Sequence, residues 1–527
     1  MEEEDNEEDA KSSSSESSNS PDKKSDEEED GKDCYDVDNV TITEKIIPEF
    51  DDYDKAEFIA PKNVLMKEVP DQFLKMTPYD LFVYYYDEFI QKICDYSNQY
   101  AIDTCNWIGA NMTKQDIYLY LFVYIYLSVY DLPEIEMLWE NSPNFKCIMP
   151  SIISKGRHGT INKYFQISSY FGEDRANKAD KINGVIEYLN KKWVETYPYT
   201  KYLSIDEAMT SYKGSVCFKQ YMKEKHKRFG IKLFSKASAD RGYCYHMLLY
   251  TGKAFQYDKR YGIGTTVVMK LSKGHENQGY HFTFDSYFSN LHTFYYCEKN
   301  KIDFTCTFSL QRKALPKEIK GLCLQAGEAK YYTIDKSNVK LFVCRDGKKQ
   351  IQMASNVYDI QFKKYKNRKN KIQYKNEIIA NYNLTKSGVD LIDSATQIYK
   401  TQRKTNKWWK AVFFYLLDVT LNNMCIIYNS SDKFHTTNLR NGALSFRRIL
   451  IEQFISLYNK QQITNTCTII REVHVLVPNE QGVKTCVRCK AQGSMKGNHY
   501  FRTRHICNIC KKPLCRDCFI QLHIDLK

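Results

Sequence analysis

Three aspartates that are far apart in the chain occur in short stretches with an apolar character. Asp206 lies in YLSIDEAM, Asp285 ends YHFTFD, and Asp390 lies in SGVDLID. A carboxylate in or at the end of an apolar strand is costly to desolvate unless it is paired or holds a metal ion. Carboxylate oxygens are the ligands that Mg²⁺ takes, and a pair of such ions promotes phosphodiester transfer. If the fold brings the three aspartates together, they predict a site for Mg²⁺ or Mn²⁺.

Two further acidic residues lie next to these aspartates. Asp393 follows Asp390 by three residues, so both face the same side of a helix, where Asp393 is either a fourth ligand or a support. Glu207 follows Asp206, and successive side chains of a strand point to opposite faces. We therefore do not expect Glu207 to be a ligand. Taken singly, each aspartate is also compatible with a surface or capping role.

A second candidate metal centre lies near the C-terminus, where six of the 18 cysteines form three Cys-x-x-Cys pairs. The predicted zinc ligands are Cys486, Cys489, Cys507, Cys510, Cys515, Cys518 and His523, with His505 or His499 to complete a second site. Two Zn²⁺ ions need eight ligands, and interleaved pairing places the first and third pairs on one ion. A module this small has little core, so the metal is expected to supply its folding energy.

The helices and strands that position the aspartates are predicted from the change in the period of hydrophobic residues along the chain. Residues 70–197 are helical in pattern, and Thr113 is expected to cap a helix with Asp116 in its first turn. From about residue 200, three strands are followed by a helix, a strand, a helix and a strand. This order predicts a mixed α/β sheet. If the sheet is RNase H-like, its first and fourth strands are neighbours, and Asp206, Asp285 and Asp390 converge at one edge.

The charge of the chain is unevenly distributed. Residues 1–39 are rich in Asp and Glu and are predicted to be a disordered leader, either a solubilising tail or a competitor for a basic surface. The net charge of the whole chain is nonetheless +12, so the remainder is strongly basic and indicates a polyanionic partner.

Two basic segments are candidates for phosphate contacts, although either could also be a solvated surface. The residues are Lys213, Lys219, Lys225, Lys227, Arg228 and Lys232 in the first segment, and Arg403, Lys404 and Lys407 in the second. Trp408 or Trp409 is placed to stack on an unpaired base, and we expect one of the two to be buried. A third basic run, KKYKNRKNK (363–371), is a candidate nuclear import signal, a DNA-backbone contact or a solvated loop.

The compartment is predicted to be intracellular and reducing. The N-terminus is acidic and lacks the apolar run of a signal peptide. The most apolar stretch, residues 117–130, is too short to span a bilayer. No membrane partner is therefore expected.

At these residues the chain resembles the piggyBac transposase family. SIDEAMTSYKGSVCFKQYMKEKHKRFGIKLF (204–234) resembles the first catalytic block of that family and FDSYFSN (284–290) the second. YNLTKSGVDLID (382–393), followed by RKTNKWWKAVFFY (403–415), resembles the third and is the most specific match. The run from Arg502 to Phe519 resembles the C-terminal finger of the family. The resemblance extends from about residue 70 to the C-terminus.

The resemblance implies an α/β fold with an RNase H-like core, a β-rich insertion, a flanking all-helical domain and a cross-brace-like zinc finger. The implied parts are a disordered acidic region (1–60), a helical dimerisation and DNA-binding domain (70–197 and 401–470), an RNase H-like catalytic domain (198–312 and 379–400), an insertion (313–378), a linker (471–483) and a zinc-binding domain (484–527).

The resemblance also implies the reaction. Asp206, Asp285 and Asp390 are the implied ligands of two Mg²⁺ or Mn²⁺ ions, with Asp393 an associated acid. The implied activity is cut-and-paste transposition, in which a released 3′-OH forms a hairpin that is reopened and joined at TTAA. The implied partners are double-stranded DNA, with its terminal inverted repeats and TTAA targets, and a second copy of the chain, in the nucleus.

The chain departs from the family pattern at three positions. Lys223 and His226 stand where prolines are frequent, and Ser286 stands where Asn is usual. These differences bring DNA affinity and end specificity into question more than chemistry. The main rival interpretation is a domesticated, sequence-specific DNA-binding or chromatin protein that does not cleave. A RING-like ubiquitin ligase is a more remote alternative, since it needs neither the aspartates nor the basic body.

Overall fold

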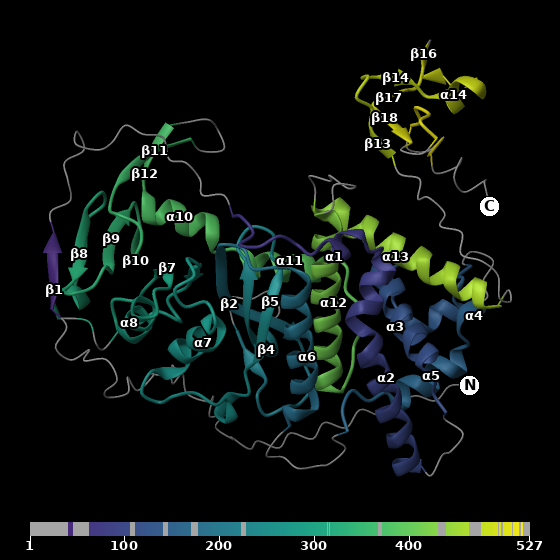
Figure 1. Ribbon diagram of the computed structural model, residues 1–527, viewed down its shortest axis with the longest axis horizontal. Helices are drawn as coiled ribbons and strands as arrows, with labels where there is room; N and C mark the ends of the chain where they lie inside the picture. Colours follow the sequence, from purple (N-terminus) through teal and green to yellow (C-terminus); the bar gives the residue numbers. More distant parts are fainter. Residues whose placement is uncertain are drawn as a thin grey trace, which may run out of the picture. The chain divides into compact units, whose positions relative to one another are not determined.

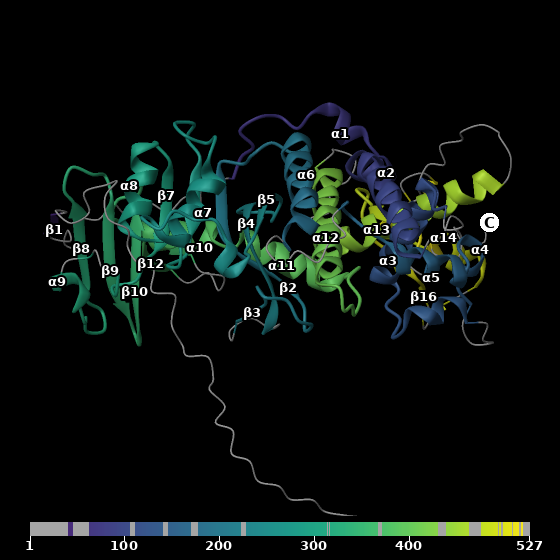
Figure 2. The same ribbon diagram turned by 90° about the horizontal axis from the view of Figure 1, so that it is seen from below.

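The computed structural model forms two compact units, Met1–Ser456 and Leu457–Lys527, each described here by itself. The ribbon is shown in two views (Figures 1 and 2). The structure describes residues 41–45, 63–105, 111–140, 146–169, 178–222, 228–312, 315, 317–366, 372–430, 439–462, 476–493, 495–496, 499–507, 510–515 and 518–519.

The first part of the larger unit is helical, as predicted. Its helices are α1 (Asp71–Lys75), α2 (Pro78–Cys105), α3 (Lys114–Val129), η3 (Ile135–Trp139), α4 (Met149–Ile152), α5 (Lys155–Tyr164) and α6 (Asp180–Thr196). Thr113 caps α3 as expected: its hydroxyl accepts from the Asp116 N–H, and the Asp116 carboxylate accepts from the Thr113 N–H at 2.8 Å. The Arg157 guanidinium also pairs with Asp116 at 2.8 Å, which ties α5 to the start of α3.

Two long helices from later in the chain complete this helical part. They are α12 (Trp408–Asn429) and α13 (Leu439–Gln462). α12 is long and apolar enough to cross a membrane by length and composition, but 89% of its apolar window is buried inside the protein. α12 packs against α6 and α2 and serves as a core helix (Figure 1).

The sheet has ten strands in the order β1-β8-β9-β10-β7-β6-β2-β4-β3, with β5 paired to β4. The strands are β1 (Ile42–Lys45), β2 (Tyr202–Ser211), β3 (Gln220–Tyr221), β4 (Phe229–Ser238), β5 (Cys244–Leu249), β6 (His281–Phe284), β7 (Asp303–Thr307), β8 (Ala329–Ile334), β9 (Lys340–Asp346) and β10 (Lys349–Ser355).

Mixed pairing at the centre of the sheet confirms the predicted neighbours. β2, β4 and β5 are antiparallel, whereas β6 lies parallel to β2 and β7 parallel to β6. The first and fourth predicted long strands, β2 and β6, are therefore adjacent. The crossover helices are α7 (Gly262–Ser272), between β5 and β6, and α8 (Leu291–Lys299), between β6 and β7.

Successive side chains of β2 and β6 point to opposite faces of the sheet, and different helices cover the two faces. Phe282 of β6 contacts His275, just after α7, on one face. Thr283 points to the other face, where its hydroxyl bonds Thr385 of α10 (Glu377–Thr385) at 2.7 Å. α11 (Gly388–Ile398) packs against β2 and β4 on the same face as α10, because Gly388 lies against Ser204 (Figure 2).

The predicted insertion adds strands to this same sheet instead of forming a separate one. β10 pairs with β7, and β9, β8 and β1 follow. A hairpin of β11 (Phe362–Lys366) and β12 (Ile372–Asn376) and the short helix α9 (Lys317–Lys320) complete the segment.

The prediction that residues 1–60 are disordered is wrong for Ile42–Lys45, which form β1. β1 pairs antiparallel with β8, and Glu44 lies 3.0 Å from the Lys330 ammonium. An exposed strand edge offers unpaired N–H and C=O groups that a short extended segment can bind. This long-range pairing has no local signal in the acidic sequence.

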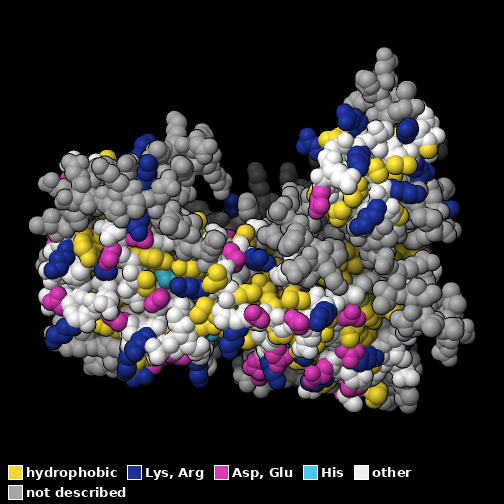
Figure 3. Space-filling model, turned by 45° about the horizontal axis from the view of Figure 1, so that its top comes forward, with side chains coloured by type: hydrophobic (Ala, Val, Ile, Leu, Met, Phe, Trp, Pro, Cys, Tyr) yellow, Lys and Arg dark blue, Asp and Glu magenta, His cyan; other side chains and the backbone are white. Residues whose placement is uncertain are grey.

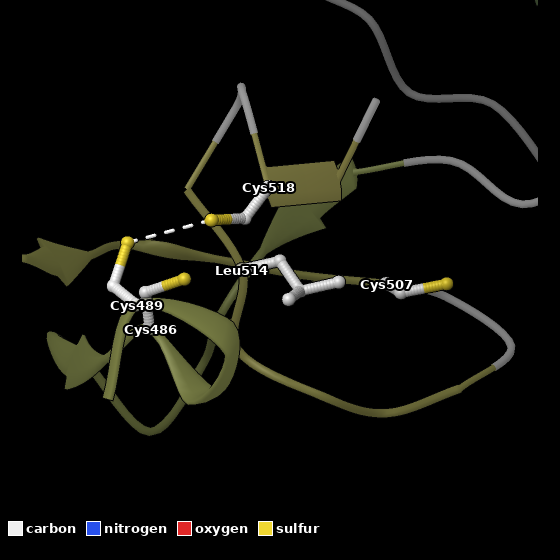
Figure 4. Close-up of a cluster of buried hydrophobic side chains, with 5 residues drawn as sticks. All are labelled: Cys486, Cys489, Cys507, Leu514 and Cys518. Atoms are coloured by element: carbon white, nitrogen blue, oxygen red, sulfur yellow. Dashed lines mark hydrogen bonds between the residues drawn. The ribbon is translucent and has the colours of Figure 1, made fainter. Parts of the chain in front are cut away.

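The second unit consists of short elements. They are β13 (Leu476–Pro478), β14 (Lys484–Thr485), α14 (Val487–Ala491), β15 (Met495–Lys496), β16 (His499–Tyr500), β17 (Arg502–Thr503) and β18 (His505–Cys507). Its buried cluster is mostly sulfur, with Leu514 beside four cysteines (Figure 4).

Candidate active site and metal centres

The acidic site lies where β6 ends beside β2. Ile205 pairs with Phe284, so Asp206 and Asp285 occupy the next positions of two adjacent parallel strands. β6 stops there, and the chain turns. The Asp285 carboxylate accepts the Tyr287 N–H at 2.9 Å, and the Ser289 hydroxyl donates to the Asp285 carbonyl at 2.7 Å. These two bonds fix the conformation of the turn and the orientation of the Asp285 carboxylate.

Three carboxylates converge at this point. Asp206, Glu207 and Asp285 each offer an oxygen, and these oxygens lie within 4.8 Å of one another. The expectation that Glu207 points away from the site is wrong. Because β6 pairs with β2 only as far as Ile205, side chains from both faces of β2 can reach the open edge.

The electrostatics of the site favour a bound cation. Burial and the Glu207 charge raise the pKa of Asp206 well above its usual value, and Asp285 adds to the effect. Burial and Glu207 also raise the pKa of Asp285 to about 6, although the N–H groups of Tyr287 and Phe288 and the Lys232 ammonium act against this. Converging carboxylates with raised pKa values suit a hard divalent cation, which would neutralise them.

Asp390 and Asp393 lie on α11 and are not in this cluster. α11 lies so close to the sheet that a Cβ at position 388 would fall 2.3 Å from Ser204 Oγ. Only glycine fits there. Asp390 follows two residues later, with an exposed side chain. Asp393 instead accepts from the Tyr415 hydroxyl of α12 at 3.4 Å. α11 therefore lies against the face of β2 that carries Asp206, while Asp390 and Asp393 are not among the carboxylates that meet within 4.8 Å of one another there.

The two predicted basic segments lie side by side. Phe218 packs edge-on against Trp408 with ring centroids 5.0 Å apart. The Tyr212 hydroxyl donates to the Asn406 carbonyl at 2.8 Å. The loop that follows the end of β2 and the approach to α12 thus form one surface. Trp409 is buried and Trp408 is half-buried, as expected for one buried member of the pair.

Most of the described basic residues of this surface are accessible. Lys213, Arg228 and Lys404 are exposed. Lys219 is half-buried, and its ammonium donates to the Gly214 carbonyl at 3.0 Å. Lys407 is also half-buried, and burial lowers its pKa. Lys225 and Lys227 lie outside the described residues.

Two predicted DNA contacts already pair with carboxylates of the protein. Arg403 pairs with Asp131 at 2.7 Å and donates to the Leu127 carbonyl at the end of α3. Lys232 is 8% exposed, and its ammonium lies 2.9 Å from a Glu207 oxygen. The expectation of a phosphate contact by Lys232 is not met in this structure, because its ammonium is buried below the surface and paired with Glu207.

The second unit brings four thiols together. Cys486, Cys489, Cys515 and Cys518 place their sulfurs within 4.8 Å of one another, the grouping expected if the first and third pairs share an ion. Cys489 Sγ lies 3.4 Å from Cys518 Sγ (Figure 4), and 3.7 Å from Cys515 Sγ. Four thiolates in this arrangement are the donor set of a structural zinc site.

Within this group the thiol of Cys486 has a lowered pKa, whereas burial raises the pKa of Cys489 to about 11 and also raises that of Cys518. Burial opposes ionisation, but the N–H groups of Cys489 and Cys515, together with the thiols of the same residues, lower the pKa of Cys486 to about 7. A thiolate at neutral pH is the form that binds a metal.

The remaining predicted zinc ligands lie apart from this group. Cys507 points away from the four thiols on the other side of Leu514 (Figure 4). The Cys510 N–H donates to Cys507 Sγ at 3.3 Å, so this pair forms its own turn. His505 is exposed, and His523 lies outside the described residues.

The surface of the second unit is strongly basic. Figure 3 shows Lys and Arg side chains beside hydrophobic ones on this unit. The exposed cations are Lys484, Lys490, Arg502, Arg504, Lys511 and Lys512. Phe501 and Val487 are 40% and 44% exposed among them. A basic surface with exposed apolar groups fits a nucleic-acid partner.

The chain is similar in sequence to known proteins. The sequence profile of the family described as Transposase IS4 matches residues 77–424. Human PiggyBac transposable element-derived protein 3 is 25% identical over 469 residues, which span 83% of this chain and 74% of that protein. Human PiggyBac transposable element-derived protein 2 is 24% identical over 370 residues, 66% of this chain and 61% of that protein.

A solved structure shows the same fold. It is a cryo-EM structure of a piggyBac transposase synaptic complex with hairpin DNA, and it matches with a TM-score of 0.65 at 19% identity. The match covers 85% of this chain and 97% of that one. The large mixed sheet with its helices is thus a shared architecture.

Proposed function

The chain belongs to the piggyBac family of transposases, and we propose that it performs cut-and-paste transposition of DNA. The observation that carries the proposal is the convergence of Asp206 and Asp285 at the end of two parallel strands, with pKa values raised by burial and by neighbouring charge. Two Mg²⁺ or Mn²⁺ ions held there would supply an activated water or 3′-OH and stabilise the leaving oxygen.

The central sheet supports an RNase H-like core. Three antiparallel strands, β2, β4 and β5, are followed by β6 and β7, each parallel to β2. Asp206 and Asp285 hold the metal, and Asp390 is proposed as the third ligand because α11 packs on the face of β2 that carries Asp206. Asp393, three residues later, accepts from the Tyr415 hydroxyl and supports α11 against α12.

The DNA lies on the surface formed by the two basic segments. Lys213, Lys219, Arg228, Lys404 and Lys407 neutralise its phosphates, and Trp408, half-buried beside Phe218, borders the strand that is cut. The proposal extends to hairpin intermediates, to integration at TTAA and to a homodimer acting in the nucleus.

The second unit is proposed to bind the transposon ends through a zinc-stabilised, basic module. Its Cys486, Cys489, Cys515 and Cys518 group would hold one zinc ion. Cys507 and Cys510, with His505 and His523, would hold a second. The exposed lysines and arginines of this unit then face the DNA backbone.

A second candidate function is DNA binding without cleavage. The observation that favours it is the exposed position of Asp390 outside the acidic cluster, which leaves the third implied ligand away from the other two. The matched human proteins are named as derived from piggyBac elements, which is compatible with either function.

An excision assay with Mg²⁺ separates the two functions. The substrate is a plasmid library of candidate terminal repeats flanked by TTAA, and binding is measured alongside cleavage. Wild type is expected to nick the flanking DNA, whereas Asp285→Ala is expected to bind DNA without detectable nicking, because it lacks a ligand of the ions that activate the nucleophile. Asp303→Ala is the matched control, since Asp303 lies beside His281 at the opposite end of the neighbouring strand. Wild-type protein that binds ends but never nicks them would establish the second function.

A further inference from the structure

The ammonium of Lys232 is buried directly behind the acidic cluster. Lys232 lies on β4 and is 8% exposed, and Glu207 on β2 is 9% exposed. The Lys232 Nζ lies 2.9 Å from Glu207 Oε1. Glu207 is also the third carboxylate of the group formed with Asp206 and Asp285. One ion pair therefore connects the interior of the sheet to the candidate metal site.

Aromatic rings fix the position of this ammonium. Its Nζ lies 4.4 Å from the ring centroid of Tyr287, 4.8 Å from that of Phe234 and 5.4 Å from that of Tyr250. Such contacts strengthen when the cation is desolvated. The cage leaves the ammonium little freedom to follow a mobile partner.

The same cage reaches Asp285. The Tyr287 ring packs on Lys232, and the Tyr287 N–H donates to the Asp285 carboxylate at 2.9 Å. Lys232 thus forms an ion pair with Glu207. It also contacts the ring of Tyr287, a residue of the turn that holds Asp285. Both contacts end on members of the acidic cluster.

We propose that Lys232 is a positioning residue of the acidic site, which holds Glu207 in an ion pair so that Asp206 and Asp285 face the divalent ion without a third free carboxylate. The inference rests on the proposed function, because it assumes that the aspartates bind a metal. It assigns Lys232 to the interior of the site and removes it from the DNA-contact surface.

A purely structural role for the ion pair predicts a different result. If Lys232 and Glu207 only stabilise the sheet, loss of either partner destabilises the protein and leaves metal affinity unchanged. If Lys232 balances Glu207, the two losses move metal affinity in opposite directions. Lys232→Met frees a carboxylate whose oxygen already lies within 4.8 Å of the aspartates. Glu207→Gln leaves an uncompensated cation beside them.

The test measures Mn²⁺ binding to the full-length protein from the electron paramagnetic resonance signal of free Mn²⁺. Glu207→Gln is expected to bind Mn²⁺ about 10-fold more weakly than wild type, within the loss caused by changing groups behind metal ligands. Lys232→Met is expected to bind it about 10-fold more tightly, a change of the same size and opposite sign, because it adds a free carboxylate where Glu207→Gln removes one. The double variant is expected within about threefold of wild type, because both charges are gone.

The matched control is Lys236→Met. Lys236 lies on the same strand and face, is 2% exposed, and its Nζ lies 3.4 Å from the Tyr199 hydroxyl instead of a carboxylate. It is expected to leave Mn²⁺ affinity unchanged. Thermal unfolding identifies variants that do not fold. If Lys232→Met is among them, Glu207→Gln and the double variant still test the proposal.

Two results separate failure of this inference from failure of the proposed function. Wild type that binds Mn²⁺ while Lys232→Met and Glu207→Gln stay within twofold of it, or shift in the same direction, overturns the role of Lys232. Wild type whose Mn²⁺ binding is absent, or is unaffected by Asp285→Ala, overturns the metal site itself.

Discussion

At the scale of single residues, burial controls ionisation even where no metal is involved. His281 on β6 is 2% exposed and lies between Tyr202 and Tyr358, with ring centroids 5.3 and 5.5 Å away. Burial, together with the Lys201 charge, lowers the pKa of His281 to about 3. In the unfolded chain an imidazole titrates near 6.5. The unfolded state therefore binds one proton more than the native state between these two values.

His281→Phe is expected to remove this pH dependence. Because the pKa of His281 is lower in the folded than in the unfolded protein, the folded protein has its full stability above pH 6.5. It loses stability as the pH falls toward 3. Wild type should lose about 2 kcal/mol relative to the variant between pH 7.5 and pH 5, at about 1.4 kcal/mol per pH unit below 6.5. Urea unfolding of both proteins at several pH values measures the difference. Parallel stability curves would mean that the native imidazole is not held neutral.

The sequence predicts some site residues well and others poorly, for a physical reason. Asp206 and Asp285 were expected to meet because strand order places their strands together, and the structure brings them together. Glu207 was excluded because side chains alternate in a strand. Alternation fixes only the face from which a side chain starts, and β6 ends at Phe284, so no described strand covers that edge of β2 beside Glu207. Where one strand stops is set by tertiary contacts and is not visible in a hydrophobic pattern.

At the scale of elements, the free edge of β5 is closed by two asparagines from helices. Asn190 of α6 donates to the Met247 carbonyl at 3.0 Å and accepts the Met247 N–H at 2.8 Å. Asn423 of α12 makes the same pair with Cys244, at 2.7 and 2.8 Å. A side-chain amide thus takes the place of a neighbouring strand. In sequence, an asparagine in a helix looks like a solvated residue, so this role could not be predicted.

Asn423→Leu is expected to destabilise the larger unit by about 2–4 kcal/mol. The N–H and C=O of Cys244 would both be left without their partner in a buried site, and each unsatisfied group costs about 1–3 kcal/mol. Equilibrium urea unfolding measures the change. Asn422→Leu is the matched control: Asn422 is half-buried and donates a single bond, to Gly242, so its loss should cost about 1 kcal/mol or less. Equal effects of the two variants would contradict the role assigned to Asn423.

Element order was more predictable than element pairing. The three strands, helix, strand, helix and strand expected after residue 200 correspond to β2, β4, β5, α7, β6, α8 and β7. Alternating and apolar runs encode these elements locally. The addition of β8 to β10 to the same sheet, and of β1 beyond them, depends on backbone hydrogen bonds between distant segments. Such pairing leaves no periodic signal in either partner.

At the scale of the whole molecule, the two units draw their stability from different sources. The larger unit contains a core of fully buried aromatic side chains, among them Trp193, Tyr85 and Phe234. The buried cluster of the second unit is four cysteines and Leu514. Such a cluster removes too little apolar surface from water to offset the entropy of ordering the chain. The second unit should therefore fold only when its thiolates bind a metal.

Zinc removal is expected to unfold the second unit and to spare the first. The full-length protein should contain about two zinc ions by elemental analysis, and Cys489→Ser should lose one of them, because Cys489 belongs to the four-thiol group. After chelation, trypsin should cut rapidly at Lys484, Lys490, Arg502 and Arg504, while the thermal transition of the larger unit stays unchanged. Cys217→Ser, at an exposed cysteine of the larger unit, is the matched control and should keep both ions. A protein without zinc whose second unit still resists trypsin would show that sulfur packing alone holds it, which its small core argues against.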